Sequence, residues 1–251
     1  MKLVKVSIML IGFLTLLLLA VFLFRNQAWL KVPDPIKSAS AQTSENPQEV
    51  EINNYQGEKL DRIADFQENS IKGSQKVDLL TYRLMVKGPD GKTVAYAYDE
   101  VLQRPHFSKV VTLHCVEGWS VKIIWDGVRI SDLLADLFPS LKESGSPAKE
   151  YGGFPPEKLV VKFFAADGYS TSLPLKTVLD RQLLLAFRMN GVTLSPERGF
   201  PFQLVAEEKW GYKWIKWVQA IEVSTDTAFK GFWESRGFNQ DGDLKGQAFD
   251  E

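Results

Sequence analysis

The sequence predicts a mixed α+β domain in which β-sheet dominates. Three observations support this prediction. Short runs of β-branched and aromatic residues recur along the chain, and turn signals rich in Gly, Asp and Asn separate them. Only two stretches show the spacing of apolar residues that a helix requires. The chain has 251 residues, of which 45% are hydrophobic, and this is enough for one well-filled core.

The chain begins with a long uncharged stretch. Between Lys5 and Arg25 lie 19 residues without a charge. A helix of that length spans about 28 Å, which is close to the thickness of a bilayer core. A cleavable signal peptide is the alternative, but the run is longer than a usual signal core and the Ala39-Ser40-Ala41 site lies far downstream. We therefore expect a single-pass transmembrane anchor over residues 1–25.

The segments around the main domain are polar. Residues 26–54 are rich in Pro, Ser, Asn, Gln and charge, which predicts a tether that holds the domain away from the bilayer. Residues 55–77 carry scattered apolar side chains, and we expect a partly ordered lead-in that packs over the domain. The domain itself is predicted over residues 78–235, and a polar C-terminal tail over residues 236–251.

The first half of the domain is predicted to contain two pairs of strands and a helix. Residues 79–86 and 93–98 are β-rich and flank a Gly-Pro-Asp-Gly turn, which is typical of a hairpin. A second pair is expected where a strand that ends at Cys115 is followed by residues 121–125. Residues 131–138 begin with Ser-Asp and then carry apolar side chains at helical spacing.

The second half is predicted to contain three strands and one helix. An Asp-Gly turn ends a strand over residues 159–166, and a helical stretch over residues 175–187 precedes an Asn-Gly turn. Strands are expected over residues 202–206 and 217–224, on either side of a segment rich in lysine and aromatic residues. With only two modest helices, the domain belongs to the sheet-dominated α+β class.

Cys115 is the only cysteine of the chain, so it cannot form an intrachain disulfide. It is a buried small hydrophobe, a nucleophile or a metal ligand. A β-rich run precedes it, and Gly118 follows it, where the backbone can turn and approach a ligand closely. A nucleophile would need His106 or His114, and on a strand His114 would point to the opposite face from Cys115. The residues alone leave these alternatives open.

Four segments carry a resemblance to one family. They are residues 115–120 (Cys-Val-Glu-Gly-Trp-Ser), 125–130 (Trp-Asp-Gly-Val-Arg-Ile), 199–205 (Gly-Phe-Pro-Phe-Gln-Leu-Val) and 210–217 (Trp-Gly-Tyr-Lys-Trp-Ile-Lys-Trp). In this order they resemble the molybdopterin-binding oxidoreductase domain shared by sulfite oxidases and the catalytic subunit of periplasmic methionine sulfoxide reductases. The resemblance covers about residues 78–235 and implies a sulfite-oxidase-type molybdopterin-binding fold.

The resemblance implies a molybdenum–molybdopterin cofactor with Cys115 as the metal ligand. Glu117 would lie on the same face of an extended segment, and we expect it to act near the metal as an acid or a hydrogen-bond acceptor. An exposed strand-end carboxylate is the alternative for Glu117. Sulfite oxidases typically have an arginine shortly after the cysteine, whereas residues 116–119 contain none. This difference favours a neutral oxide such as a sulfoxide over sulfite.

The resemblance also implies where the phosphate of the cofactor binds. Lys216 and the backbone around Trp214 and Ile215 are the expected cradle, because backbone N–H groups and a lysine together bind phosphate well. Lys213 is expected as a further contact. The preceding loop lacks the arginine that the family often has there, so Arg198 is the candidate that supplies this charge.

These observations predict a membrane-anchored oxidoreductase that performs two-electron oxygen-atom transfer on a small molecule. The chain has no haem or flavin motif, so electrons are expected from a separate electron-transfer protein or from a membrane quinone or cytochrome. The resemblance favours an extracytoplasmic catalytic domain, although residues 1–5 lack twin arginines. With 30 Lys plus Arg against 31 Asp plus Glu, nothing indicates nucleic-acid binding. The alternative is a non-catalytic or cofactor-altered binding module with the same fold.

Overall fold

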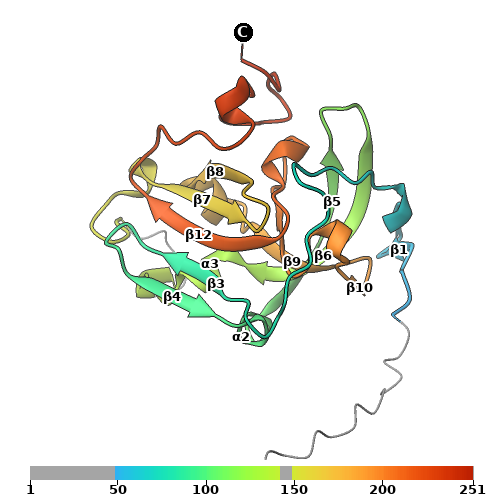
Figure 1. Ribbon diagram of the computed structural model, residues 1–251, viewed down its shortest axis with the longest axis horizontal. Coiled ribbons are helices and arrows are strands. Elements are labelled where there is room, and N and C mark those ends of the chain that lie inside the picture. The colour runs from blue at the N-terminus through green and yellow to red at the C-terminus, as the bar shows by residue number, and fades with distance from the viewer. Residues whose placement is uncertain (1–48, 142–148, 251) are drawn as a thin grey trace, which may run out of the picture. The chain divides into compact units, whose positions relative to one another are not determined.

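The structure, a computed structural model, describes residues 49–141 and 149–250. Two five-stranded sheets dominate this part of the chain, and short helices connect their strands (Figure 1). The predicted sheet-dominated fold is therefore confirmed. The predicted anchor, residues 1–25, and the tether as far as residue 48 lie outside the described residues. Within the described ranges, no helix is long and apolar enough to cross a membrane.

The first sheet carries Cys115 at the end of one of its strands. Its path runs β10–β9–β6–β5, and β11 also pairs with β9. All of these pairs are antiparallel, and β5 and β6 form a long hairpin with Cys115 at the start of the turn. The strands are β5 (His106–His114), β6 (Ser120–Arg129), β9 (Leu184–Met189), β10 (Val192–Thr193) and β11 (Gln203–Val205).

The second sheet joins the early hairpin to later strands. Its order is β4–β3–β12–β7–β8, in which β3 and β12 pair in parallel and the other neighbours are antiparallel. The hairpin predicted around the Gly-Pro-Asp-Gly turn is present as β3 and β4, although β3 begins later than predicted. The strands are β3 (Leu84–Lys87), β4 (Thr93–Tyr96), β7 (Val160–Ala165), β8 (Ser170–Pro174) and β12 (Val218–Ser224).

The remaining elements are short. A two-stranded ribbon of β1 (Asn54–Tyr55) and β2 (Glu58–Lys59) precedes the two sheets. The α-helices are α2 (Tyr98–Leu102), α3 (Ile130–Leu134) and α4 (Leu175–Asp180). The 3-10 turns are η2 (Ile63–Asp65), η3 (Pro139–Leu141), η4 (Pro156–Lys158), η5 (Pro196–Arg198), η6 (Gly211–Lys213) and η7 (Glu234–Arg236).

The predicted helix over residues 175–187 is wrong in its second half. The helix α4 ends at Asp180, and Gln182 adopts a positive φ of 47°, which a continuing helix does not allow. The chain then enters β9, a strand that pairs with three others and is buried from Leu184 to Phe187. A continuous apolar run fits a buried strand as well as a buried helix, so periodicity did not separate the two.

One hydrophobic core cluster contains residues of both sheets, among them Val86, Ile123 and Phe163. At one edge of this core the end of β5 meets the chain just before η6, through an isolated parallel bridge between His114 and Trp210. Gly211 follows directly, and a Cβ atom there would lie 3.2 Å from the His114 carbonyl oxygen. The absence of a side chain at Gly211 therefore lets η6 approach the Cys115 turn closely.

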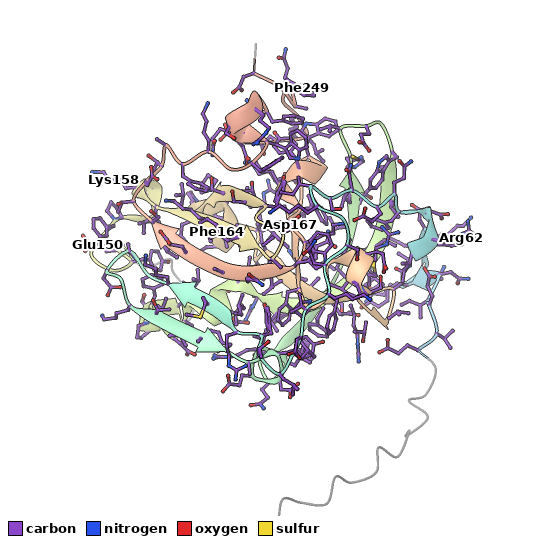
Figure 2. The ribbon with its side chains drawn as sticks, viewed as in Figure 1. Arg62, Glu150, Lys158, Phe164, Asp167 and Phe249 are labelled. Carbon is purple, nitrogen blue, oxygen red and sulfur yellow. The ribbon has the colours of Figure 1, made fainter. Side chains whose placement is uncertain are left out.

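The segments before and after the predicted domain both pack against it. Glu51 accepts a hydrogen bond from the side chain of Asn190 at 3.0 Å, and Lys209 in the domain forms a bridge with Asp243 in the predicted tail. Figure 1 shows the C-terminal segment leaving β12 and turning back over the molecule. Figure 2 shows Phe249 near the C-terminal end, whereas Asp167 lies among interior side chains.

Candidate active site

Cys115 occupies the tight turn between β5 and β6. The turn is closed by two backbone hydrogen bonds, from Cys115 N to the Trp119 carbonyl at 2.9 Å and from Gly118 N to the Cys115 carbonyl at 3.1 Å. Gly118 has a φ of 90°, a conformation that a side chain would disfavour. The Cys115 side chain is buried, with 7% of its surface exposed, and lines a cavity. The strand end therefore delivers the thiol to this cavity.

Glu117 lies beside this thiol. Its Oε2 atom is 3.8 Å from Cys115 Sγ and accepts a hydrogen bond from the Trp119 indole at 3.2 Å. The expected extended segment is in fact a turn, yet the two side chains still meet. Burial raises the pKa of the Cys115 thiol; a backbone hydrogen bond at Glu117 opposes this shift, and the Glu117 carboxylate adds to it. The surroundings therefore disfavour the thiolate, and a bound cation would stabilise it.

The cavity beside Cys115 has a volume of about 400 Å³. This volume is in the usual range for a small-molecule or cofactor site. Its lining combines aromatic rings, three carboxylates and two cationic side chains, and it comes from the lead-in, the β5–β6 turn, η5, η6 and the C-terminal segment. The lining includes Phe66, Asn69, Cys115, Glu117, Trp119, Asp167, Tyr169, Glu197, Arg198, Gln203, Tyr212, Trp214, Ile215, Lys216, Trp233, Phe238 and Phe249.

Lys216 reaches this cavity as predicted from the resemblance. Its ammonium lies 3.0 Å from Glu68 Oε1 and donates a hydrogen bond to the Glu197 carbonyl at 3.1 Å. Burial lowers the pKa of Lys216, and the ion pair with Glu68 partly offsets this effect. Trp214 and Ile215 line the same cavity, so the residues of the predicted cradle lie close together.

Arg198 enters the cavity from η5. Its guanidinium donates a hydrogen bond to the Phe66 carbonyl at 2.8 Å and lies 5.2 Å from the centre of the Phe66 ring. Burial lowers its pKa, and the nearby carboxylate of Glu68 opposes this shift. Arg198 and Lys216 thus line one cavity, which is the arrangement expected if Arg198 supplies the charge that the family often takes from a later arginine.

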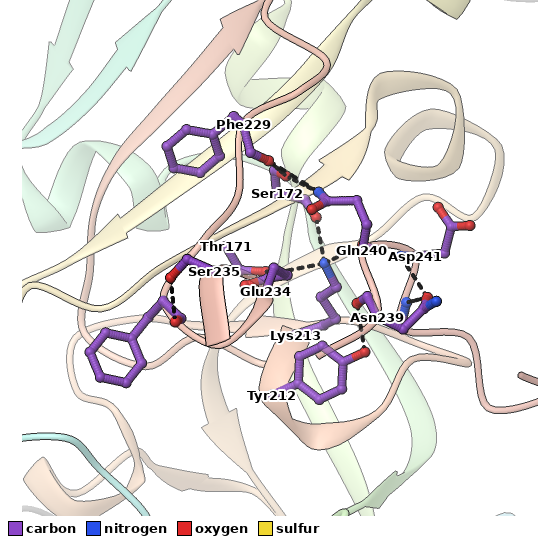
Figure 3. A network of polar contacts seen from close by, with 12 residues as sticks. Thr171, Ser172, Tyr212, Lys213, Phe229, Glu234, Ser235, Asn239, Gln240 and Asp241 are labelled. Atoms are coloured by element: carbon purple, nitrogen blue, oxygen red, sulfur yellow. Dashed lines mark hydrogen bonds and ion pairs between the residues drawn. The ribbon is translucent and has the colours of Figure 1, made fainter. Parts of the chain in front are cut away.

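Lys213 does not line the cavity, in contrast to the prediction. Its side chain is completely buried and its ammonium donates to Glu234 Oε1 at 2.6 Å and to the Gln240 carbonyl at 2.6 Å (Figure 3). Lys213 is the last residue of the turn η6, whereas Lys216 lies beyond it. The two lysines are three residues apart and contact different partners. The two lysines therefore have separate roles, and Lys213 anchors the C-terminal segment.

Some lining residues were not predicted. Asn69 in the lead-in forms a side-chain hydrogen bond that lowers the pKa of the Cys115 thiol, against the larger effect of burial. Trp233, Phe238 and Phe249 come from the end of the chain. The sequence offers no signal that points to Asn69. The aromatic residues of the tail do give a signal, because they stand out in a polar segment.

Neither histidine is part of the cavity lining. His106 Nε2 lies 2.8 Å from the Leu102 carbonyl, and His114 lies on β5 before the turn. Within the described ranges, no three His, Cys, Asp or Glu side chains are grouped so that they could hold a metal ion.

The domain that carries this cavity matches a known family. The profile of a family described as "oxidoreductase molybdopterin binding domain" matches residues 71–233. The chain belongs to this family. Its members are oxidoreductases that bind a molybdenum–molybdopterin cofactor, so the resemblance seen in the sequence is confirmed, as are the cofactor and the enzyme class.

Relatives of this molybdopterin-binding domain include several named oxidoreductases. An uncharacterized oxidoreductase of Bacillus subtilis, YuiH, is 31% identical over 66% of this chain and 76% of its own length. A putative protein-methionine-sulfoxide reductase subunit of Azospira oryzae, YedZ1, is 34% identical over 66% of this chain and 57% of its own. The mitochondrial sulfite oxidase of Rattus norvegicus is 28% identical, and the match spans only 32% of that protein.

A solved structure supports the fold of the domain. The sulfane dehydrogenase SoxCD of Paracoccus pantotrophus matches with a TM-score of 0.52 and 24% identity, over 68% of this chain and 45% of that one. The cavity also fits the family's cofactor. It offers one thiol, two cationic side chains and the Lys216 amide, which donates to no backbone carbonyl among the described residues. These are the groups that hold a metal and a phosphate.

Proposed function

We propose that this oxidoreductase transfers an oxygen atom to or from a neutral oxide, and that it reduces sulfoxides in preference to oxidising sulfite. In this proposal Cys115 is the protein's ligand to molybdenum. Lys216 and Arg198, with the backbone at Trp214 and Ile215, hold the phosphate end of the cofactor. When bound, the cofactor supplies two-electron exchange with the substrate, which is chemistry that the side chains themselves do not have.

The single observation that carries the substrate preference is the position of Glu117. A carboxylate 3.8 Å from Cys115 Sγ places negative charge where an anionic substrate such as sulfite would bind. Asp167 and Glu197 are further carboxylates of the cavity lining. Arg198 and Lys216 are its only cationic side chains among the described residues, and both are assigned to the cofactor. A neutral oxide avoids this repulsion.

Glu117 also has a place in the chemistry. Reduction of a sulfoxide consumes two electrons and two protons and yields a thioether and water. Glu117 Oε2 is the carboxylate oxygen beside the metal ligand, so it is the natural carrier of one of these protons. The Trp119 indole fixes the carboxylate by donating a hydrogen bond to it.

Electrons have to come from outside the chain in this proposal. We propose a separate electron-transfer protein, or a membrane quinone or cytochrome, as the donor. A transmembrane anchor over residues 1–25 and an extracytoplasmic catalytic domain would bring the enzyme close to such a donor. The uncharged run between Lys5 and Arg25 supports this part of the proposal.

The test compares two reactions on the same cofactor-loaded protein. We expect reduction of methionine sulfoxide with reduced benzyl viologen as the electron donor, and little oxidation of sulfite with ferricyanide as the acceptor. Glu117→Gln removes the charge and keeps the shape, so it should raise sulfite oxidation relative to sulfoxide reduction. Glu207→Gln, at a carboxylate that pairs with Lys109 outside the cavity, is the matched control. A wild-type kcat/KM for sulfite above that for every sulfoxide tested would overturn the proposal.

A further inference from the structure

The C-terminal segment forms a small hairpin that carries two aromatic rings in contact. Asn239 N donates to the Ala248 carbonyl at 3.0 Å, and Asp250 N donates to the Gly237 carbonyl at 2.9 Å. This pairing places the Phe238 and Phe249 rings opposite each other, with their centres 4.4 Å apart. The hairpin is therefore an ordered element that presents an aromatic face, although the sequence predicts only a polar tail.

The two rings belong to a larger aromatic cluster at the cavity. Phe238 lies 5.0 Å from Tyr212 and 5.0 Å from Trp233, measured between ring centres. We call Trp233, Phe238 and Phe249 the aromatic wall. All three line the same cavity as Cys115. Phe249 is 53% exposed, so this wall ends in an apolar ring that the rest of the described chain covers only in part.

A buried ion pair fixes the position of the aromatic wall. Glu234, next to Trp233, is 1% exposed and receives hydrogen bonds from Lys213 at 2.6 Å and from the Thr171 hydroxyl (Figure 3). Lys213 also donates to the Gln240 carbonyl, two residues after Phe238. Lys213 of η6 therefore holds the chain both before Phe238, at Glu234, and after it, at Gln240. Because η6 itself lies against the Cys115 turn, these contacts fix the position of the aromatic wall relative to the thiol.

We infer that the aromatic wall binds the apolar substituent of the substrate and makes the enzyme select sulfoxides that carry an aromatic or bulky apolar group. This inference rests on the proposed function and specifies its substrate class. An exposed aromatic ring in the lining of a cavity is a favourable site for an apolar group, which removes the ring from water. A thioether sulfur, as in the reduced product, also packs favourably against aromatic rings.

Binding without turnover tests the wall directly. The cofactor-loaded full chain is titrated calorimetrically with methyl phenyl sulfoxide and with dimethyl sulfoxide, in the absence of any reductant. We expect the aryl sulfoxide to bind at least about tenfold more tightly. Phe249→Ala should reduce this ratio about threefold to tenfold, in line with the loss of one aromatic contact. The same ratio is then measured as kcat/KM with reduced benzyl viologen.

Two further variants make the test decisive. Phe154→Ala removes another partly exposed phenylalanine, 37% exposed and outside the cavity, and should leave the ratio unchanged. Phe249→Leu keeps an apolar side chain against Phe238 but removes the ring, so it should also lower the ratio while the thermal midpoint stays near that of the wild type.

The possible outcomes separate the inference from the proposed function. If both Phe249 variants fold and keep the wild-type ratio, the wall does not select the substrate, even if sulfoxides are reduced. If the ratio falls in the binding experiment but no sulfoxide is turned over, the wall stands and the proposed function fails. Equal affinity of the wild type for the two sulfoxides overturns the inference without any variant.

Discussion

At the scale of single residues, the setting of Cys115 separates two kinds of cysteine. Burial and the Glu117 carboxylate both raise the pKa of its thiol, which makes it a poor nucleophile in the absence of a metal. Neither histidine lines the cavity to act as a base. A metal ligand, in contrast, gains its thiolate from coordination itself. Of the roles that the sequence left open for Cys115, this environment favours the metal ligand over the nucleophile.

The first prediction concerns this sulfur. Cys115→Ser changes one atom in a small side chain, so we expect the fold to survive with a loss of about 1 kcal/mol, or roughly 2–4 °C in thermal midpoint. We expect molybdenum content and sulfoxide reduction to fall below detection, because a hydroxyl is a far weaker ligand than a thiolate. Metal analysis and thermal unfolding of the same sample check both parts. A variant that keeps the wild-type rate would exclude Cys115 as the ligand.

The second prediction contrasts the two lysines that the resemblance grouped together. Lys216→Ala should lower pterin content at least tenfold at limiting cofactor, because one charge-assisted contact is worth about 1.5–3 kcal/mol. Lys213→Ala should instead destabilise the fold by about 3–5 kcal/mol, because it leaves the Glu234 carboxylate buried without its cation. Pterin fluorescence and thermal unfolding are measured for both.

A double variant provides the control for the buried pair. Lys213→Met combined with Glu234→Gln removes both charges and should recover much of the stability lost in Lys213→Ala. Equal pterin loss in the Lys216 and Lys213 single variants, at unchanged stability, would contradict the separate roles assigned to these lysines.

At the scale of elements, local signals in the sequence predict some strands and miss others. The β3–β4 hairpin and the strand before Cys115 were predictable because turn residues and β-rich runs coincide there. The helix over residues 175–187 failed where the run Leu183–Phe187 carries no alternation. A strand that is buried on both faces needs no alternation of polar and apolar residues. Only the pairing of β9 with β6, β10 and β11 identifies it as a strand.

The third prediction tests the point where this helix ends. Gln182 adopts a φ of 47°, which costs free energy for a residue with a side chain and none for glycine. Gln182→Gly should therefore stabilise the fold by up to about 1 kcal/mol. Lys176→Gly, two turns earlier at an exposed position of α4, should destabilise it by about 1 kcal/mol. Opposite signs in urea unfolding are expected, and a loss of stability in Gln182→Gly would refute the explanation.

At the scale of the whole molecule, the candidate site extends further than the predicted domain. The sequence indicated Cys115, Glu117, Arg198 and Lys216, since each lies in or next to a motif, and all four line one cavity. Asn69 and Phe249 lie outside the predicted domain and carry no motif. They reach the cavity only through long-range packing of the lead-in and of the C-terminal hairpin, which no local pattern encodes.

The fourth prediction concerns where the folded part of the chain begins. Residues before Tyr55 contact the sheet, because Thr193 N donates to Glu49 Oε2 at 2.7 Å and Ile52 N donates to the Asn190 carbonyl at 3.0 Å. A fragment of residues 49–251 should therefore be more stable than one of residues 55–251, by about 1–2 kcal/mol after allowance for solvent exposure. Thermal unfolding of the two fragments measures this difference.

The stability difference between the fragments should depend on pH. The hydrogen bond from Thr193 N lowers the pKa of Glu49 in the folded state. A carboxyl group with a lowered folded pKa adds stability above its unfolded pKa, and this contribution is lost as the pH falls through the folded value. The advantage of the longer fragment should thus be full at pH 7 and shrink below about pH 4. A difference that grows on acidification would contradict the role of Glu49.

Cys115 carries the single sulfhydryl group of the chain, and this affects both folding and the measurement of cofactor content. A chain with one thiol cannot acquire a mispaired internal disulfide, so its folding would need no disulfide isomerase even under oxidising conditions. The same thiol can be used to measure the fraction of molecules without cofactor. If Cys115 is the metal ligand, a small alkylating reagent should modify only molecules whose thiol is not ligated, provided that the reaction is run at a pH high enough to ionise this buried thiol. One intact-mass spectrum would then give the cofactor occupancy of a preparation.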